Sequence, residues 1–410
     1  MEKFGLNLEK YAELIIKVGL NLQSGEELVI SAPIESADLV RAVTSMAYNS
    51  GAKLVTVFYD DEVVARQTYL NADSSVICDI PTYLKESKKY IVDSKAVYLG
   101  IICDDPEIFD GVEPEKITAR QRAVVKACPE YRKSLDNNQT RWCLVAYPHE
   151  KWAKKVFPNK SNAMELLGEK IATSLWLDKE NCLELWQEHA NNLKSRSKIL
   201  NDKKIKKFRY KNSLGTDFTI EMPKGYIFSG ANEKGTLDGV EFVANMPTQE
   251  VFSSPDYRTA NGKLVASMPL VRNGVIIKDF YLVFRDGVVV EYKAEQGENT
   301  LKEILEIDEG MKRLGEIALV GYDSPIRKSG VLYFETLFDE NASCHFALGK
   351  SFSSCYTGGS SMSKEELMEV GLNDSLSHVD FMVGTSDLTI TAECYSGEII
   401  TIFKDGKWTF

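Results

Sequence analysis

Several features that would assign this chain to a familiar class are missing from its sequence. The eight cysteines are scattered and form no Cys-x-x-Cys pair, which argues against a thiolate zinc finger. We interpret them as reduced thiols of a cytoplasmic protein. No apolar run approaches the roughly 18 residues of a membrane-spanning helix. The first ten residues are charged and lack the apolar core of a signal peptide.

Positive charge is also scarce. Lys and Arg together number 49 against 60 Asp and Glu, which gives a net charge of −11. This balance argues against general binding to nucleic acid or to an anionic membrane surface. Hydrophobic residues make up 44% and charged residues 27%, as is typical of proteins that bury sizeable cores. A length of 410 residues makes two domains the natural expectation.

Nucleotide-binding motifs are incomplete. No Gly-x-Gly-x-x-Gly follows any expected strand, so dinucleotide binding loses its main support. The stretch from Cys344 to Ser351 ends in Gly-Lys-Ser, but the cysteine stands where a phosphate loop needs its first glycine. His149-Glu150 begins like His-Glu-x-x-His and lacks the second histidine, so we expect a surface turn there. A nucleotide-binding protein therefore remains only a weaker alternative.

The first half of the chain alternates apolar strand-like runs with helical patterns. Such alternation predicts parallel crossovers and therefore a doubly wound α/β domain. Ser36 is expected to be the N-cap of the second helix, and His189 to pack in the core on the apolar face of the last one. The expected strands are 27–32, 53–59, 95–103 and 141–147, and the expected helices are 8–22, 36–51, 61–72, 82–93, 118–135, 162–177 and 178–200.

The second half is rich in strands. Asn273-Gly274, Asp286-Gly287 and Asp405-Gly406 each separate β-type runs, which is the strongest short-range indication of a hairpin. Residues 203–207 are mostly lysine and indicate a solvated linker or edge. We therefore predict an α/β domain over 1–202 and a β-rich, barrel-like domain over 203–410. One helix is expected from the capping box at Thr300 to about Gly315, with Glu316 at its exit.

Two of the four histidines lie near the C-terminus, each close to a carboxylate. His378 and Asp380 are two residues apart in an apolar run that reads as a strand, so they project from the same face. Glu340 precedes His345 by five residues. A core histidine hydrogen-bonded to an acid would explain either pair alone. Two such pairs in a chain so poor in histidine favour a metal site.

Several short motifs resemble those of the thermophilic-type metallo-aminopeptidases, the group of aminopeptidases T and S and PepS. Together the motifs span nearly the whole chain and occur in the order of that family, although none is specific alone. The first half agrees more loosely than the second. The motifs are Arg141-Trp142, Trp152-Ala153 with Phe157-Pro158, Met246 to Phe252 with Pro255-Asp256, Gly315-Glu316, Leu337 to Ala342 with His345, and His378 to Gly384.

The resemblance implies a C-terminal domain that binds two divalent metal ions, such as zinc, cobalt, manganese or magnesium. Such a pair polarises the scissile carbonyl and activates a water, and a carboxylate moves the proton to the leaving amine. Glu316 is expected either to bridge the ions or to act as the base. The implied metal ligands are Glu250, Glu316, Glu340, His345, His378 and Asp380.

One position departs from the family pattern. The family carries a tyrosine seven residues after the first of these histidines, and this chain has Phe352, which cannot donate a hydrogen bond to an oxyanion. Tyr356, four residues later, is the candidate replacement, with an ordinary aromatic packing role as the alternative. The expected function is a cytoplasmic, homodimeric aminopeptidase for short peptides. A non-catalytic metal- or peptide-binding protein on the same scaffold is the main alternative.

Overall fold

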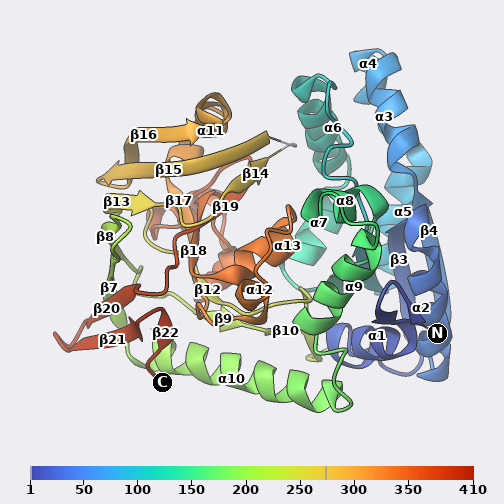
Figure 1. Ribbon diagram of the computed structural model, residues 1–410, viewed down its shortest axis with the longest axis horizontal. Coiled ribbons are helices and arrows are strands. Elements are labelled where there is room, and N and C mark those ends of the chain that lie inside the picture. Colours follow the sequence, from blue (N-terminus) through green and yellow to red (C-terminus); the bar gives the residue numbers. More distant parts are fainter. Residues whose placement is uncertain (1, 273–274) are drawn as a thin grey trace. The chain divides into compact units, whose positions relative to one another are not determined.

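The computed structural model describes residues 2–272 and 275–410, which form two compact units (Figure 1). Unit 1 comprises Met1–Glu188 and Asn232–Pro247, and unit 2 comprises His189–Ala231 and Thr248–Phe410. The long helix α10 (Cys182–Asp202) carries the chain from the first unit into the second. The division into domains 1–202 and 203–410 stays a prediction. Among the described residues, no helix combines the length and apolarity needed to cross a membrane.

Unit 1 is built on a four-stranded parallel sheet with the strand order β4-β3-β5-β6. All four strands were predicted, and their parallel pairing is confirmed. The strands are β3 (Glu27–Pro33), β4 (Leu54–Asp60), β5 (Val97–Ile102) and β6 (Trp142–Ala146). The longer helices are α1 (Leu8–Leu14), α2 (Ala37–Asn49), α3 (Glu62–Asn71), α5 (Thr82–Asp93), α6 (Pro114–Ala127), α7 (Pro129–Asp136), α8 (Glu150–Val156) and α9 (Ala163–Ser174).

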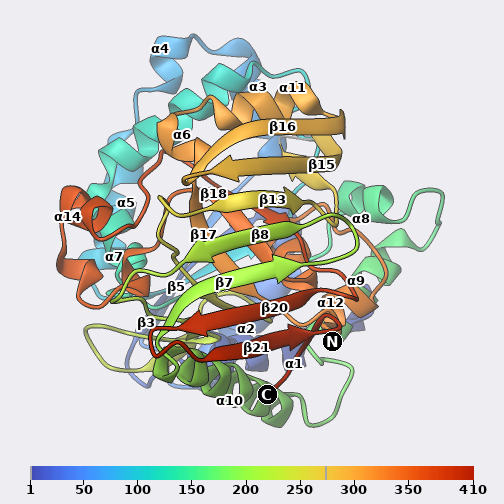
Figure 2. The same ribbon diagram turned by 90° about the vertical axis from the view of Figure 1, so that its left-hand side faces the viewer.

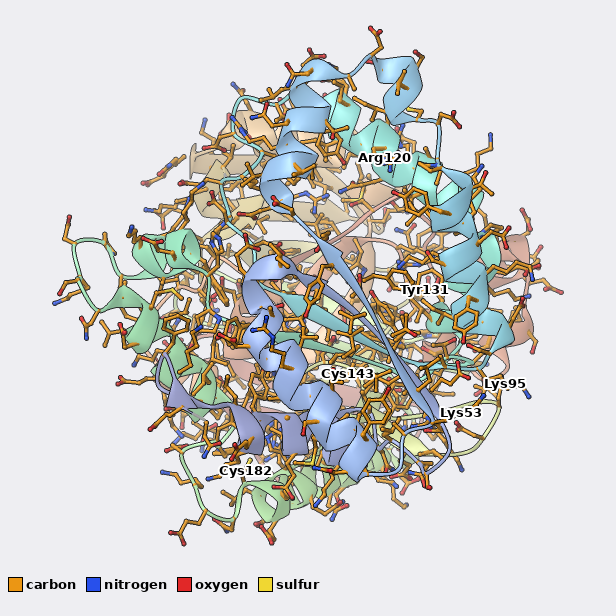
Figure 3. The ribbon with its side chains drawn as sticks, turned by 90° about the vertical axis from the view of Figure 1, so that its right-hand side faces the viewer. Lys53, Lys95, Arg120, Tyr131, Cys143 and Cys182 are labelled. Atoms are coloured by element: carbon orange, nitrogen blue, oxygen red, sulfur yellow. The ribbon has the colours of Figure 1, made fainter. Side chains whose placement is uncertain are left out.

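Charged residues gather where the parallel strands of unit 1 begin. Lys53 and Lys95 lie close together at this edge (Figure 3), and Lys53 Nζ is 2.7 Å from Glu27 Oε1. Arg141, which precedes β6, is buried and forms ion pairs with Glu26 and Asp238. The two carboxylates compensate the charge of the Arg141 guanidinium, which explains how this residue can be buried, whereas Lys53 and Lys95 are exposed.

Three local expectations for unit 1 were wrong or incomplete. The helix expected over 118–135 is two helices, because Pro129 lacks an N–H and disfavours helical geometry in the residue before it. His149 does not lie in a surface turn but is the N-cap of α8, with Nδ1 accepting from the N–H of Lys151. Ser36 is the N-cap residue of α2, yet its hydroxyl donates to the carbonyl of Pro33 instead of capping the helix.

Unit 2 contains two antiparallel sheets, of nine and five strands. The nine-stranded sheet is seen face on in Figure 2 and follows the order β14-β15-β13-β8-β7-β20-β21-β22, with β16 beside β15. Its strands are β7 (Ile205–Lys211), β8 (Asp217–Glu221), β13 (Asn261–Val265), β14 (Leu270–Arg272), β15 (Val275–Arg285), β16 (Val288–Gln296), β20 (Thr389–Cys394), β21 (Ile399–Lys404) and β22 (Lys407–Trp408).

The smaller sheet has the order β19-β18-β17-β12-β9. Phe346 on the second strand in this order, β18, packs against Tyr210 and Phe218 of the larger sheet, with ring centroids 5.0 and 5.3 Å apart. The core of unit 2 therefore lies between the two sheets. The strands are β9 (Ser229–Gly230), β12 (Val251–Ser253), β17 (Leu314–Leu319), β18 (His345–Gly349) and β19 (His378–Met382).

Short elements complete the two units. Unit 1 also holds β1 (Glu2–Lys3), β2 (Leu6–Asn7), η1 (Ile15–Gly19), η2 (Ile34–Ser36), α4 (Ser74–Ile77), β10 (Asn232–Lys234) and β11 (Glu241–Val243). Unit 2 also holds α11 (Glu298–Leu305), η3 (Glu309–Lys312), α12 (Pro325–Lys328), α13 (Thr336–Asp339), η4 (Glu340–Ala342), η5 (Ser353–Cys355), η6 (Gly359–Ser361) and α14 (Lys364–Glu369).

The predicted hairpins at Asp286-Gly287 and Asp405-Gly406 are confirmed, and Asn273-Gly274 lies outside the described residues. The linker expected over 203–207 was wrong, because β7 starts at Ile205 and pairs on both sides with β8 and β20. The helix expected to run from Thr300 to Gly315 was also wrong in extent. It is α11, which starts after Gly297 and ends at Leu305, so Glu316 lies in β17 and not at a helix exit.

Candidate metal centre

One face of the five-stranded sheet carries most of the predicted metal ligands. Glu316 of β17 is opposite Ala347 of β18, and Ala347 is in turn opposite Asp380 of β19. His345 and His378 are each two residues from one of these positions, so both project from the same face. The small side chain of Ala347 leaves the space between the two carboxylates open.

The ligand atoms form two groups of three. One group is Glu250, Glu316 and His345, and the other is Glu316, His378 and Asp380. Within each group the candidate ligand atoms all lie within 4.8 Å of one another. Glu316 belongs to both groups and is only 4% exposed, which places its carboxylate between two potential cation sites.

Both histidines direct Nε2 toward the carboxylates. His345 Nε2 lies 3.1 Å from Glu250 Oε2. His378 Nε2 lies 2.9 Å from Glu316 Oε2 and 3.2 Å from Asp380 Oδ1. The Nδ1 atoms face backbone carbonyls, at 3.3 Å from Ser343 for His345 and at 2.7 Å from Lys350 for His378. A proton on Nδ1 would be held by these carbonyls, which leaves Nε2 free to bind a metal.

The pKa values show strong coupling between these buried groups. Burial raises the pKa of Glu316 to about 7, although the hydrogen bond from His378 opposes this rise. Burial alone would lower the pKa of His345, but the Glu250 carboxylate raises it to about 10. Burial would likewise raise the pKa of Asp380, yet the charge of His378 holds it below its usual value. These shifts follow from the concentration of carboxylates in a buried site.

Two observations test whether divalent cations fit these residues. Glu250 Oε2 is buried and has no well-aligned hydrogen bond from the described part of the chain, although His345 Nε2 lies 3.1 Å away. A buried carboxylate oxygen without a donor is costly unless a cation faces it. In addition, Glu250, Glu316, Glu340 and Asp380 together carry four negative charges when ionised, which two divalent ions would balance. The residues fit a pair of such ions.

Glu340 lies beside the two groups but belongs to neither. It starts η4, and burial, followed by repulsion from Asp380 and Glu250, raises its pKa well above the usual value. The next residue, Asn341, fixes this segment from inside. Its Oδ1 accepts the N–H of Gln249 at 2.6 Å, and its Nδ2 donates to the carbonyl of Leu337 at 3.0 Å.

The two aromatic residues of interest lie in different places. The ring of Phe352 is next to that of His378, with centroids 4.9 Å apart, so position 352 borders the site. The ring of Tyr356 packs against Gly225, and its backbone forms an isolated antiparallel β-bridge with Tyr226. These contacts hold Tyr356 to the 225–226 segment.

Sequence reasoning missed the residues that position the ligands. Asn341 is fully buried, and Ala347 separates two carboxylates, yet neither residue type stands out in a sequence. The asparagine directly after Glu340 could have been noticed, because a polar residue inside an apolar stretch usually has a buried partner. The backbone carbonyls of Ser343 and Lys350 could not be predicted as partners of the histidines, since every residue has a carbonyl.

Comparisons with known proteins identify the family of this chain. The family model described as thermophilic metalloprotease (M29) matches residues 4–408. This chain belongs to that family. Aminopeptidase AmpS of Bacillus subtilis (strain 168) is 38% identical over 412 residues, which covers 100% of both chains. Aminopeptidase T of Thermus aquaticus is 35% identical over 413 residues, again with 100% of both chains covered.

A solved structure extends the likeness to the fold. The structure titled wild-type AmpT from Thermus thermophilus aligns with a TM-score of 0.91 and 34% identity, over 98% of this chain and 99% of that chain. The mixed α/β fold, with a parallel sheet in the first half and antiparallel sheets in the second, is therefore shared with AmpT. By its family and its full-length relatives, the chain is an aminopeptidase of the metalloprotease class.

Proposed function

We propose that this protein hydrolyses the bond after the N-terminal residue of short peptides, using two divalent metal ions. The observation that carries the proposal is the position of Glu316 in both groups of ligand atoms. A carboxylate between two cation sites is the arrangement that a two-metal hydrolase needs. The proposed ligands are Glu250, Glu316, Glu340, His345, His378 and Asp380, and the zinc, cobalt, manganese or magnesium ions would polarise the scissile carbonyl and the attacking water.

The protein groups have separate tasks in this proposal. Glu316, which belongs to both groups of ligand atoms, would hold the two ions or act as the base, and it is the proposed catalytic carboxylate. His345 and His378 each contribute a neutral Nε2, which their Nδ1 contacts with backbone carbonyls maintain. The Asn341 side chain ties the segment before β12 to the helix carrying Glu340, and so fixes the spacing of Glu250 and Glu340.

A direct experiment measures metal and activity together. Purified protein should contain about two divalent ions per chain and release N-terminal amino acids from peptides. A chelator should abolish this activity, and addition of a divalent ion should restore it. His378→Ala should retain the fold, bind less metal and lose turnover. A fully metallated wild-type protein that cleaves no member of an aminoacyl-substrate panel would refute the catalytic proposal.

A second candidate function is a non-catalytic metal- or peptide-binding protein on the same scaffold. It is favoured by Phe352, which borders His378 and offers no hydrogen bond to an oxyanion. Tyr356 was the predicted substitute, and its packing against Gly225 does not support that role. This candidate predicts metal in elemental analysis without turnover.

Two further predictions concern the assembly and location of the protein. A homodimer is supported by exposed apolar residues around the edge strand β4 and helix α3, in which no side chain is buried. These residues are Leu54, Phe58, Tyr59, Val63 and Val64. The cytoplasmic location, the doubly wound topology of the first domain and the barrel-like form of the second stay predictions.

A further inference from the structure

A half-buried arginine of unit 2 has no carboxylate partner. Arg272 ends the short strand β14, and it forms no ion pair with any acid in the described part of the chain. Within the same residues, its guanidinium donates one side-chain hydrogen bond, from Nη2 to Ser377 Oγ at 3.4 Å. A guanidinium has five N–H donors, so most of its capacity is unused. Charged groups withdrawn from water usually have a partner, and a ligand is the natural source of one for Arg272.

Strand β14 runs beside β19, the strand that carries two of the proposed metal ligands (Figure 1). Leu270 and Val271 of β14 line one small pocket together with Asp380 of β19. The hydrogen bond of Arg272 reaches Ser377, the residue directly before His378. The guanidinium therefore lies next to the proposed metal centre, at the outer strand of the five-stranded sheet.

The charge of Arg272 would be left uncompensated once metal is bound. Burial lowers the pKa of Arg272, and the charge of Asp380, which forms no ion pair with it, opposes this effect. Two divalent ions would balance the four carboxylates of the site, so Asp380 would no longer offset the guanidinium. The loaded site would then carry one surplus positive charge at this edge, which a bound anion would neutralise.

The shape of a guanidinium favours one kind of anion. Its planar fork matches the two oxygens of a carboxylate and can bind both at once. The oxyanion of the reaction, in contrast, is a single oxygen that the two metal ions already stabilise. In a short peptide, the C-terminal carboxylate follows the scissile bond by one or two residues, each spanning about 3.3–3.6 Å when extended. Such a spacing fits a guanidinium that is near Asp380 without touching it.

We propose that Arg272 binds the C-terminal carboxylate of a short peptide substrate. The inference rests on the proposed function, because the metal ions would hold the scissile carbonyl beside this guanidinium. Peptides of two or three residues would place their carboxylate within its reach. Longer peptides would carry their carboxylate past Arg272 and leave its charge unpaired, so they would bind less tightly.

Binding is measured with analogues that cannot be cleaved, so that it does not depend on turnover. Zinc-loaded protein is titrated by calorimetry with leucyl-glycine in which CH2–NH replaces the peptide bond, and with the C-terminal amide of the same compound. The wild-type protein should bind the acid about 10- to 100-fold more tightly, as a charge-assisted hydrogen bond implies. Arg272→Gln should abolish this preference by weakening only the binding of the acid.

Turnover gives a second measurement. Arg272→Gln should raise KM for leucyl-glycine by about 10- to 100-fold and leave both kcat and KM for leucyl-glycinamide nearly unchanged. In the wild type, kcat/KM should fall by a similar factor from leucyl-glycyl-glycine to leucyl-pentaglycine. The fall with length should disappear in Arg272→Gln.

Control variants separate ligand binding from a structural role. Arg272→Lys keeps the charge without the planar fork and should retain part of the preference, which also provides a test if the glutamine variant fails to fold. Arg285→Gln changes an exposed arginine at the other end of β15, roughly 30 Å along that strand, and should leave the preference intact. Metal content and melting temperature should match those of the wild type in all three variants.

Each outcome has a defined meaning. Equal affinity of the wild type for acid and amide, or an unchanged preference in Arg272→Gln, would overturn the inference, and hydrolysis of both peptides would leave the proposed function intact. A fall in kcat for acid and amide alike would also overturn it, because the guanidinium would then act on the oxyanion. If the acid analogue is preferred through Arg272 but no peptide is cleaved, the proposed hydrolysis fails while the carboxylate site stands.

Discussion

His345 and His378 are oriented in the same way from neighbouring strands. Each has Nδ1 near a backbone carbonyl, that of Ser343 or Lys350, and each directs Nε2 at a buried carboxylate. The backbone carbonyls therefore favour the proton on Nδ1, so that a metal ion would displace the proton on Nε2. Since backbone carbonyls remain in any side-chain variant, this orientation should survive mutations elsewhere in the site.

Removal of metal should destabilise the protein as well as inactivate it. Without cations, the four site carboxylates repel one another in a buried space, and only protons relieve the repulsion. Adding a divalent ion at about 100 times its dissociation constant should stabilise the fold by about 2.7 kcal/mol. Thermal unfolding with and without a chelator measures the shift. His378→Ala should show a smaller shift, and an equal one would contradict the assignment of that ligand.

Ala347→Val should weaken metal binding more than it weakens the fold. The added methyl groups would enter the space between Glu316 and Asp380, which flank position 347 on the same face. The overpacking itself should cost about 1–3 kcal/mol. Ala392→Val in the buried part of β20 is a matched control that adds the same volume away from the site. Equal loss of metal in both variants would argue against the proposed geometry.

Phe352→Tyr should increase turnover. The ring borders His378, so a hydroxyl added at its tip can donate a hydrogen bond to an oxyanion at the site. Removal of one such donor commonly costs about 100-fold or more, so an increase of about 10- to 100-fold in kcat is expected. Tyr356→Phe should leave kcat unchanged, because its ring packs against Gly225. A loss of activity in Tyr356→Phe would instead support Tyr356 as the hydrogen-bond donor to the oxyanion.

His189 should make stability depend on pH in the acidic range. Burial lowers its pKa from 6.5 to about 4, while its Nε2 remains 2.8 Å from the carbonyl of Thr248. Between these values the unfolded chain binds the proton and the folded chain does not. Stability is therefore intact above pH 6.5 and falls as the pH drops toward 4, by up to about 3 kcal/mol.

The measurement for His189 is a difference between two proteins. Denaturant unfolding of the wild type and of His189→Gln is compared from pH 7.5 to pH 4.5, both in the metal-free form. The glutamine does not titrate, so the stability gap between the proteins should shrink as the pH falls. Parallel curves would show that this histidine is not the source of the pH dependence.

The alternation of strands and helices in unit 1 was readable because buried parallel strands form short apolar runs between turn residues. The break at Pro129 was equally readable and was overlooked. The lysine-rich stretch at 203–207 misled because its charges hide the start of a buried strand. Ile205, Phe208 and Tyr210 are buried, whereas Lys206 and Lys207 stay partly exposed.

The site itself was only partly accessible to sequence reasoning. His378 and Asp380 share a strand, so their common face follows from the period of two. Glu316 was placed after a helix because every residue of β17 is buried, and a run without polar alternation gives no sign of a strand face. Glu250 comes from a distant segment, and only the family resemblance selected it from the other acids.

The two faces of the five-stranded sheet differ in polarity, because polar and apolar residues alternate along one strand. On β18, His345 and Ala347 face the acids, while Phe346 between them packs into the core of unit 2. A shift of one residue in strand pairing would bury the imidazole among phenyl rings and expose Phe346 to carboxylates. Ligands for the proposed cations come from β17, β18 and β19, so bound cations would stabilise only the alignment in which Phe346 also reaches the core.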